Sequence, residues 1–231
     1  MARDFDGATG NLARSGVVSV ATNNFTICAW IMVDVAQAGG IITNGFDGGS
    51  GAGWRLRINA DPSVRMTLNF VVSLNGTTVL TLGRWYHCLG VRDAGTTSLY
   101  VDGVSEGGTT ASAPTAPATY FRIGCNINNA GTNVDFFSGK VVETGVWERA
   151  LTTTEITNLA SGYAPSFFPQ NLVHYAPITG ADSPEDDKKS TTNLTVTAAP
   201  RFAHPDFMKY PNKPSPNIII RPRAFAPGLA R

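Results

Sequence analysis

The first candidate for chemistry in this sequence is an aromatic side chain. Trp54 follows a glycine-rich stretch at residues 48–53. Carbohydrate sites often place an aromatic ring beside a few polar groups, so Trp54 is the candidate for glycan binding. The alternative is that Trp54 packs into the protein at the start of a strand. The stretch at 48–53 lacks the Lys-Ser/Thr pair and the following helix of a phosphate-binding loop.

Paired carboxylates are the next chemistry to test. A retaining glycosidase needs two carboxyl groups about 5 Å apart. Glu143, Glu148 and Glu155 span a predicted strand, a turn and a helix, so they share no face. We expect Glu143 on a strand surface and Glu155 in a helix cap. No Gly-x-Ser-x-Gly elbow occurs, although spacing alone leaves a Ser-His-Asp triad open. We predict no catalytic residues and no enzyme.

Metal ligands follow no recognised pattern. The cysteines and histidines are scattered without the spacing of a zinc site: Cys28, Cys88, Cys125, His87, His174 and His204. We expect buried free thiols, with a Cys28–Cys88 disulfide as the alternative. Calcium takes about six or more oxygen ligands, and the loop candidates form no such set: Asp47, Asp61, Asp93, Asn126, Asn128, Asn129 and Asp135. We predict no metal site and no cofactor, with calcium as the alternative.

The elements that must position these residues are mainly strands. The 231-residue chain is 15% charged and contains 24 glycines, which is typical of an all-β protein with many tight turns. No apolar run reaches the roughly 20 residues of a membrane helix. The first residues show no secretory leader. We expect no membrane partner.

Strand-like segments recur along the chain. The apolar run 25–33 predicts a strand buried on both faces or in a sandwich core. Residues 54–58 alternate, which predicts half exposure. Asn75-Gly76 predicts a hairpin turn between strands at 66–74 and 77–82. Further strands are predicted at 84–92, 98–103, 121–124, 136–147, 171–178 and 194–197, with a solvated charged loop at 182–189.

One short helix is predicted after the last long strand of the body. Thr152 and Glu155 have the spacing of a capping box. Ile156 and Leu159 supply an apolar stripe. Gly162 stands where a helix-ending glycine belongs. The chain is therefore expected to be a two-sheet sandwich with one helix.

The C-terminal segment differs from the body. Residues 201–231 carry six basic side chains against one acidic, and six prolines interrupt them. Proline at this density disfavours helix and central strand, so we predict an extended arm after a domain at 1–200. The residues expected to bind a partner are Ile218, Ile219, Ile220, Arg221, Arg223 and Phe225. The basic charge is too dispersed to favour nucleic acid.

An ordered series of short motifs resembles the laminin-G-like, concanavalin-A-like lectin jelly roll, in its pentraxin-related branch. The series is Phe5-Asp6-Gly7, 25–30, 83–87, 99–103, 121–124, 137–147, Ala150-Leu151 and Glu155-Ile156. The resemblance covers about residues 3–200. It implies two curved antiparallel sheets packed face to face. Late strands after the helix are similar to an extension found in phage-type proteins.

This resemblance leaves the function open, because one fold hosts many functions. Our first hypothesis is a non-enzymatic virion protein. It would be a phage capsid decoration or tail-associated protein, held by its arm on the major capsid protein or another virion protein, as a homo-oligomer. The alternative is a carbohydrate-binding adhesion module that uses the rim near Trp54 to bind a surface glycan. Both can coexist in one chain.

Overall fold

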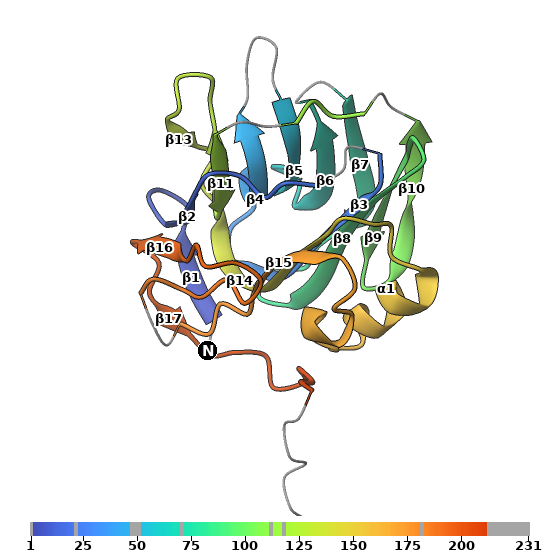
Figure 1. Cartoon of the computed structure of the whole chain (residues 1–231). Coiled ribbons are helices and arrows are strands. Elements are labelled where there is room, and N and C mark those ends of the chain that lie inside the picture. The colour runs from blue at the N-terminus through green and yellow to red at the C-terminus, as the bar shows by residue number, and fades with distance from the viewer. Residues whose placement is uncertain are drawn as a thin grey trace, which may run out of the picture.

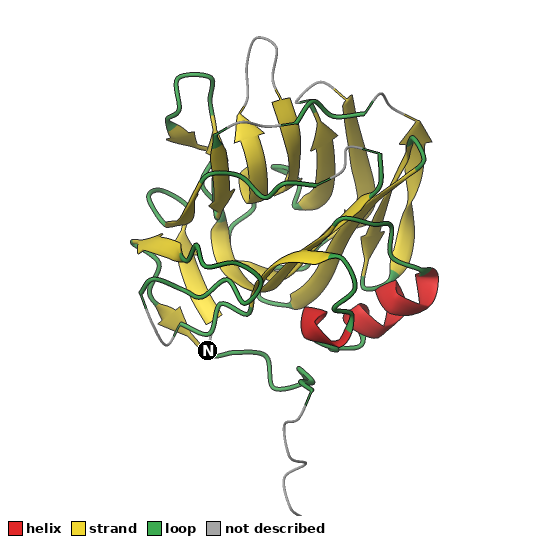
Figure 2. Ribbon diagram, in the orientation of Figure 1, coloured by secondary structure: helices red, strands yellow, loops and turns green. Residues whose placement is uncertain are grey.

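Two antiparallel sheets pack face to face around a common core (Figures 1 and 2). The architecture confirms the predicted all-β jelly-roll sandwich with one α-helix. The computed structural model describes residues 2–20, 23–46, 52–69, 72–110, 113–116, 119–180 and 183–211. The predicted partner-binding residues between Ile218 and Phe225 lie outside these ranges.

Sheet one has the helix on its outer side. Its described strands, in order across the sheet, are β10 (Val104–Thr110), β9 (Thr96–Val101), β8 (Trp85–Asp93), β3 (Phe25–Val33), β14 (Ser138–Trp147), β1 (Ala2–Asp6) and β17 (Arg201–Phe202), and β15 (Leu172–Ala176) also pairs with β14. The first and last of the strands listed for this sheet therefore come from distant parts of the chain.

Sheet two forms the other layer. Its described strands, in order, are β16 (Leu194–Thr197), β2 (Asn11–Ser15), β11 (Tyr120–Ile123), β4 (Gly39–Phe46), β5 (Ala52–Ile58), β6 (Ser63–Leu68) and β7 (Val72–Val79). A separate hairpin joins β12 (Asn126–Ile127) to β13 (Asn133–Val134). The late strands predicted at 171–178 and 194–197 correspond to β15 and β16.

Strand β3 shows why sheet one is covered on both faces. Ile27, Ala29 and Ile31 belong to the core between the sheets. Cys28 and Trp30 alternate with them and belong to a second apolar cluster on the outer face. All nine residues of the strand are therefore buried. This confirms the expectation from its unbroken apolar run.

The helix α1 (Thr153–Ala160) covers part of that outer face. Its capping box is present, since Thr152 accepts from the Glu155 backbone N–H and Glu155 accepts from that of Thr152. Ile156 and Leu159 are buried in the outer cluster. A short 3-10 helix, η1 (Pro165–Phe167), follows. Within the described ranges, no helix is long and apolar enough to cross a membrane.

The prediction of a hairpin turn at Asn75-Gly76 is wrong. Strand β7 runs through both residues, and the chain reverses after Leu68 instead. Asn69 takes a left-handed conformation there, with φ of 48°. Its side chain also accepts a 2.7 Å hydrogen bond from the Thr115 backbone. This long-range contact favours the turn at Asn69 over the local Asn-Gly signal.

Two expectations about exposed charges are also wrong. Arg55 and Arg57 on β5 are buried, although their alternation predicted half exposure. Arg57 pairs with Asp135 at 3.4 Å, so a carboxylate offsets its buried charge. In the loop predicted to be solvated, Glu185 is buried against Arg3 at 2.7 Å. The buried charges of Arg57 and Glu185 thus each have a partner far away in the chain.

The folded body extends beyond the boundary predicted at residue 200. Strand β17 pairs with β1. The strap, which we define as residues 203–211, then packs on the outer face of sheet one. Met208 is buried there, and the Lys209 backbone N–H donates to the carbonyl of Gly162 at 2.7 Å. At least eleven residues assigned to the arm thus belong to the body.

Candidate functional site

One buried cluster has the residue types of a catalytic triad. His174 Nδ1 lies 2.8 Å from Asp187 Oδ2, and His174 Nε2 lies 3.2 Å from Thr144 Oγ1. Arg14 also pairs with Asp187, at 2.8 Å. All three members of the triad-like set are buried. A nucleophile must meet its substrate, so this cluster is structural rather than catalytic.

Hydrogen bonds also keep Asp187 ionised. Burial by itself would raise its pKa, because it disfavours the charged form. Hydrogen bonds from His174 and from the backbone of Lys189 and Tyr175 outweigh that effect. They hold the pKa of Asp187 below its usual range.

Glu143 is buried, which corrects its predicted place on a strand surface. The hydroxyls of Tyr175 and Tyr210 donate to its carboxylate at 2.9 and 2.6 Å. His204 Nε2 lies 3.3 Å from the same group. Because Tyr210 and His204 belong to the strap, Glu143 helps to hold the strap on the body. Glu155 caps α1 and pairs with Arg149 at 2.7 Å, which confirms its expected place in a helix cap.

Trp54 is buried, contrary to the prediction of an exposed glycan-binding ring. Its side chain is only 1% exposed and stacks on Phe25, with ring centroids 5.7 Å apart. Both rings belong to the core between the sheets. No ring face is left for a sugar. The expectation of an exposed platform at Trp54 is wrong, and its alternative, packing within the strand, is what occurs.

The residues considered as candidate metal ligands are used elsewhere or stand apart. The three cysteines are buried free thiols, so the Cys28–Cys88 bridge is absent. Burial raises the pKa of each thiol. Asp61 accepts from Ser63 and Asn126 donates to Asp135, while Asp47 lies outside the described residues. Among the residues the structure describes, no group of three metal-ligating His, Cys, Asp or Glu side chains exists.

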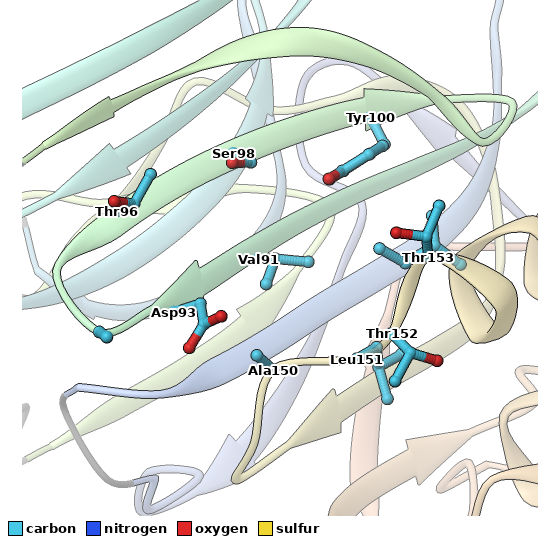
Figure 3. Close-up of a pocket in the computed structure, with 11 residues that line it drawn as sticks. Val91, Asp93, Thr96, Ser98, Tyr100, Ala150, Leu151, Thr152 and Thr153 are labelled. Atoms are coloured by element: carbon cyan, nitrogen blue, oxygen red, sulfur yellow. The ribbon is translucent and has the colours of Figure 1, made fainter.

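The outer face of sheet one instead carries an open groove, groove one (Figure 3). Its volume is about 650 Å³. One side is formed by strands β8 and β9 and the other by the chain entering α1. The lining residues are Val91, Asp93, Ala94, Thr96, Ser98, Tyr100, Ala150, Leu151, Thr152, Thr153 and Ile156.

Strand alternation places the polar side chains in groove one. Successive residues of a strand point to opposite faces. On β9, Thr97, Leu99 and Val101 are buried, so Thr96 and Ser98 face outward into the groove (Figure 3). The opposite wall is in place because the capping box fixes where α1 begins.

The polar groups of groove one are mostly unused by the protein. Within the described part of the chain, no side-chain hydrogen bond engages Asp93, Thr96, Ser98, Tyr100 or Thr153. Their polar groups surround an apolar base of Val91, Leu151 and Ile156. Unused hydroxyls around an apolar base can bind an amphipathic ligand.

The charge of groove one further limits the class of ligand that it can bind. Of the described residues that line the groove, Asp93 is the only charged one. A carboxylate accepts hydrogen bonds and repels anions. Among the residues that the structure describes, the groove therefore offers acceptors, hydroxyls and one phenol ring, but no cation for a phosphate or sulfate group. Sequence reasoning noticed Asp93 only as a calcium candidate. The alternation of polar residues in β9 was the feature of the sequence that could have indicated this groove.

Comparison with known proteins agrees with this fold. A family model for the concanavalin A-like lectin/glucanases superfamily matches residues 6–157. No curated protein sequence matches the chain significantly.

Three solved structures are similar to the chain in fold. A protein from Bacteroides ovatus, to which carbohydrate binding is ascribed, is 22% identical with a TM-score of 0.65; the match covers 86% of this chain and 58% of that one. A heptameric SAP-like pentraxin from Limulus polyphemus is 17% identical with a TM-score of 0.56, covering 85% and 95%. Domain 4 of a Geobacillus stearothermophilus arabinanase, solved with arabinotriose, is 18% identical with a TM-score of 0.52, covering 69% and 76%.

These matches agree with the two-sheet all-β fold described above. The chain spans little more than half of the Bacteroides protein. The sequence match over residues 6–157 covers more than half of this chain. The chain is therefore a member of the concanavalin A-like lectin/glucanase superfamily, with a laminin-G-like jelly roll that is similar in fold to a pentraxin.

Proposed function

We propose that this protein binds neutral carbohydrate in groove one and has no enzymatic role. The observation that carries the proposal is the set of unused polar groups around Val91, Leu151 and Ile156. Sugar rings present hydroxyls at their edges and C–H groups on their faces, which match such a lining. The lectin-like fold supports it, as do the carbohydrate binding ascribed to the Bacteroides ovatus protein and the arabinotriose bound by the arabinanase domain.

Asp93 supports a neutral ligand over an acidic one. It is the only charged residue in the lining formed by the described part of the chain, so a sialylated or sulfated sugar would bring an anion toward a carboxylate. A single carboxylate also supports recognition without cleavage, because glycoside hydrolysis generally uses a pair.

A glycan array carrying matched neutral and acidic glycans tests the proposal. We expect binding to neutral members, weakened in Thr96→Ala and Asp93→Asn. Thr195→Ala and Asp186→Asn serve as matched controls, since Thr195 is exposed on β16 and Asp186 pairs only with Lys188 at the surface. Failure of the folded protein to bind any glycan, or equal loss in the controls, would overturn the proposal.

The virion role stays a prediction. It rests on the resemblance to phage-type proteins and on the basic, proline-rich segment 201–231, where Ile218–Ile220, Arg221, Arg223 and Phe225 would contact a capsid or other virion protein. Deleting 212–231 tests it. We expect attachment to particles to be lost while glycan binding is retained. Particles that still carry the shortened chain would contradict this role.

A further inference from the structure

A second groove, groove two, lies at the other end of α1. Its volume is about 350 Å³. Its lining residues are Trp30, Arg84, Trp85, Asp102, Ala160, Ser161 and Phe207. Groove one contacts α1 at Thr153 and Ile156, whereas groove two contacts the end of the helix at Ala160 and Ser161.

The two grooves are separated by a direct contact. The β9–β10 turn brings Gly103 against the helix, where a Cβ atom at Gly103 would lie 3.1 Å from the Cβ of Ala160. Asp102 and Gly103 both have positive φ, and Gly103 at 79° leaves no side chain in this contact. The two grooves share no lining residue, so each is a separate site.

Aromatic rings from three distant segments meet in groove two. Trp30 comes from β3, Trp85 from β8 and Phe207 from the strap. The Phe207 ring lies 4.6 Å from that of Trp30 and remains 44% exposed. Trp85 is also partly exposed. Aromatic faces that stay open to water offer stacking surfaces to a ring with an apolar face.

Charged groups stand beside these rings. Arg84 and Asp102 form an ion pair at 3.4 Å, and the Arg84 side chain is 63% exposed. Asp102 also accepts a 2.8 Å hydrogen bond from the His87 backbone. Guanidinium groups carry five donors and carboxylates several lone pairs. Both groups therefore retain capacity for the hydroxyls of a ligand that stacks on the rings.

The strap makes groove two dependent on the C-terminal segment. Its position is fixed by Tyr210 on Glu143 at 2.6 Å and by the Lys209 backbone bonds to Gly162 and Ala164 at 2.7 and 3.0 Å. Phe207 lies within this fixed segment. Without the strap, groove two would lose one of its three aromatic walls.

We propose that groove two is a second carbohydrate site, which binds a single sugar ring by stacking on Trp85 and Phe207 and by hydrogen bonds to Arg84 and Asp102. This inference extends the proposed function from one site to two on the same side of the sandwich. Two sites favour branched or repeating glycans displayed on a surface, because linked ligands gain affinity from simultaneous binding.

Indole NMR signals test the inference. The chain has four tryptophans, of which Trp30 and Trp85 line groove two while Trp54 and Trp147 are fully buried. Methyl α-glucoside, methyl β-galactoside and N-acetylglucosamine would be titrated separately. We expect at least one sugar to shift the Trp30 and Trp85 indole signals with saturation. The Trp54 and Trp147 signals should not move.

Phe207→Ala provides the decisive variant. We expect the variant to bind the sugar roughly tenfold more weakly, as measured from the shifts of the Trp30 and Trp85 indole signals. The response of the Thr96 and Ser98 amides should not change. Phe202→Ala is the matched control, since Phe202 is 37% exposed in β17 and contacts Lys140 instead. Unchanged affinity in Phe207→Ala would overturn the inference.

The two grooves fail in distinguishable ways. If the Thr96 and Ser98 amides respond while the indoles do not, groove two is not a sugar site and the proposed function stands. If only the indoles respond, groove one is not a sugar site and groove two stands. If a folded protein shows neither response to any of the three sugars, both proposals are overturned.

Discussion

The triad-like cluster and groove one contain similar residue types in opposite situations. Thr144, His174 and Asp187 satisfy one another inside the protein. In groove one, Asp93 and Ser98 line an open space with no side-chain hydrogen bonds among the described residues. Polar groups bonded inside a protein contribute to folding, while unused groups at its surface are available to a ligand. Residue type alone therefore does not distinguish a cluster that stabilises the fold from one that is open to a ligand.

The largest expected effect comes from Asp187→Asn. This change leaves Arg14 and His174 without their carboxylate in a buried site, which costs about 3–5 kcal/mol of unfolding free energy. Urea denaturation measures it. The neighbouring Asp186→Asn is the control, because Asp186 pairs with Lys188 at the surface and its loss should cost under about 1 kcal/mol. Equal losses would show that the buried cluster is not structural.

A smaller effect is expected from pH through His87. Burial lowers its pKa to about 3, against about 6.5 in the unfolded chain. Between these values the unfolded chain binds a proton that the folded chain does not, so stability falls as the pH is lowered. The slope is up to about 1.4 kcal/mol per pH unit.

The His87→Leu variant isolates that slope. Urea midpoints measured from pH 6.5 down to pH 4 should fall less steeply in the variant than in the wild type. Parallel curves would contradict a neutral buried histidine at this position.

Thr152→Ala compares a hydroxyl that is bonded within the protein with an unused hydroxyl of the same groove. Thr152 lines groove one, but its hydroxyl is used by Glu155. Loss of a helix cap costs about 1 kcal/mol. Thr153→Ala, which removes the adjacent unused hydroxyl, should change stability by less than about 0.5 kcal/mol. Thermal unfolding of both variants makes the comparison, and a larger loss in Thr153→Ala would contradict it.

The smallest stability effect is expected within groove one itself. Ser98→Ala should leave the unfolding free energy within about 0.5 kcal/mol. Its affinity for a neutral glycan should fall by about two- to tenfold, as for one hydrogen bond. Calorimetric titration beside a urea curve measures both. A loss of stability without a loss of binding would show that Ser98, like Asp187, stabilises the fold and does not bind the ligand.

Local signals in the sequence predicted local structure well. The capping box at Thr152 and Glu155 and the strand at 25–33 depend on neighbouring residues or on an unbroken apolar run. The hairpin turn failed at Asn75-Gly76 because Asn69 makes a contact 46 residues away. Burial of Glu185 depends on Arg3, which is 182 residues distant.

The candidate site was harder to predict for the same reason. The outward residues of β9 are visible as an alternation between residues 96 and 100. Their groove exists only because the chain from Ala150 to Ile156 returns to the same face. Trp54 was selected from its neighbours in sequence, but its environment is set by Phe25. Sequence order carries little information on such pairings.

The position of β1 has a consequence for synthesis of the protein. Its residues pair with Ser138–Val141 on one side and with Arg201 and Phe202 on the other. During translation, the strand near the N-terminus must wait for more than a hundred further residues, which takes on the order of ten seconds at typical elongation rates. Its unpaired edge is exposed to other nascent chains for that time. Crowded expression should therefore reduce yield more than the stability of the finished sandwich would indicate.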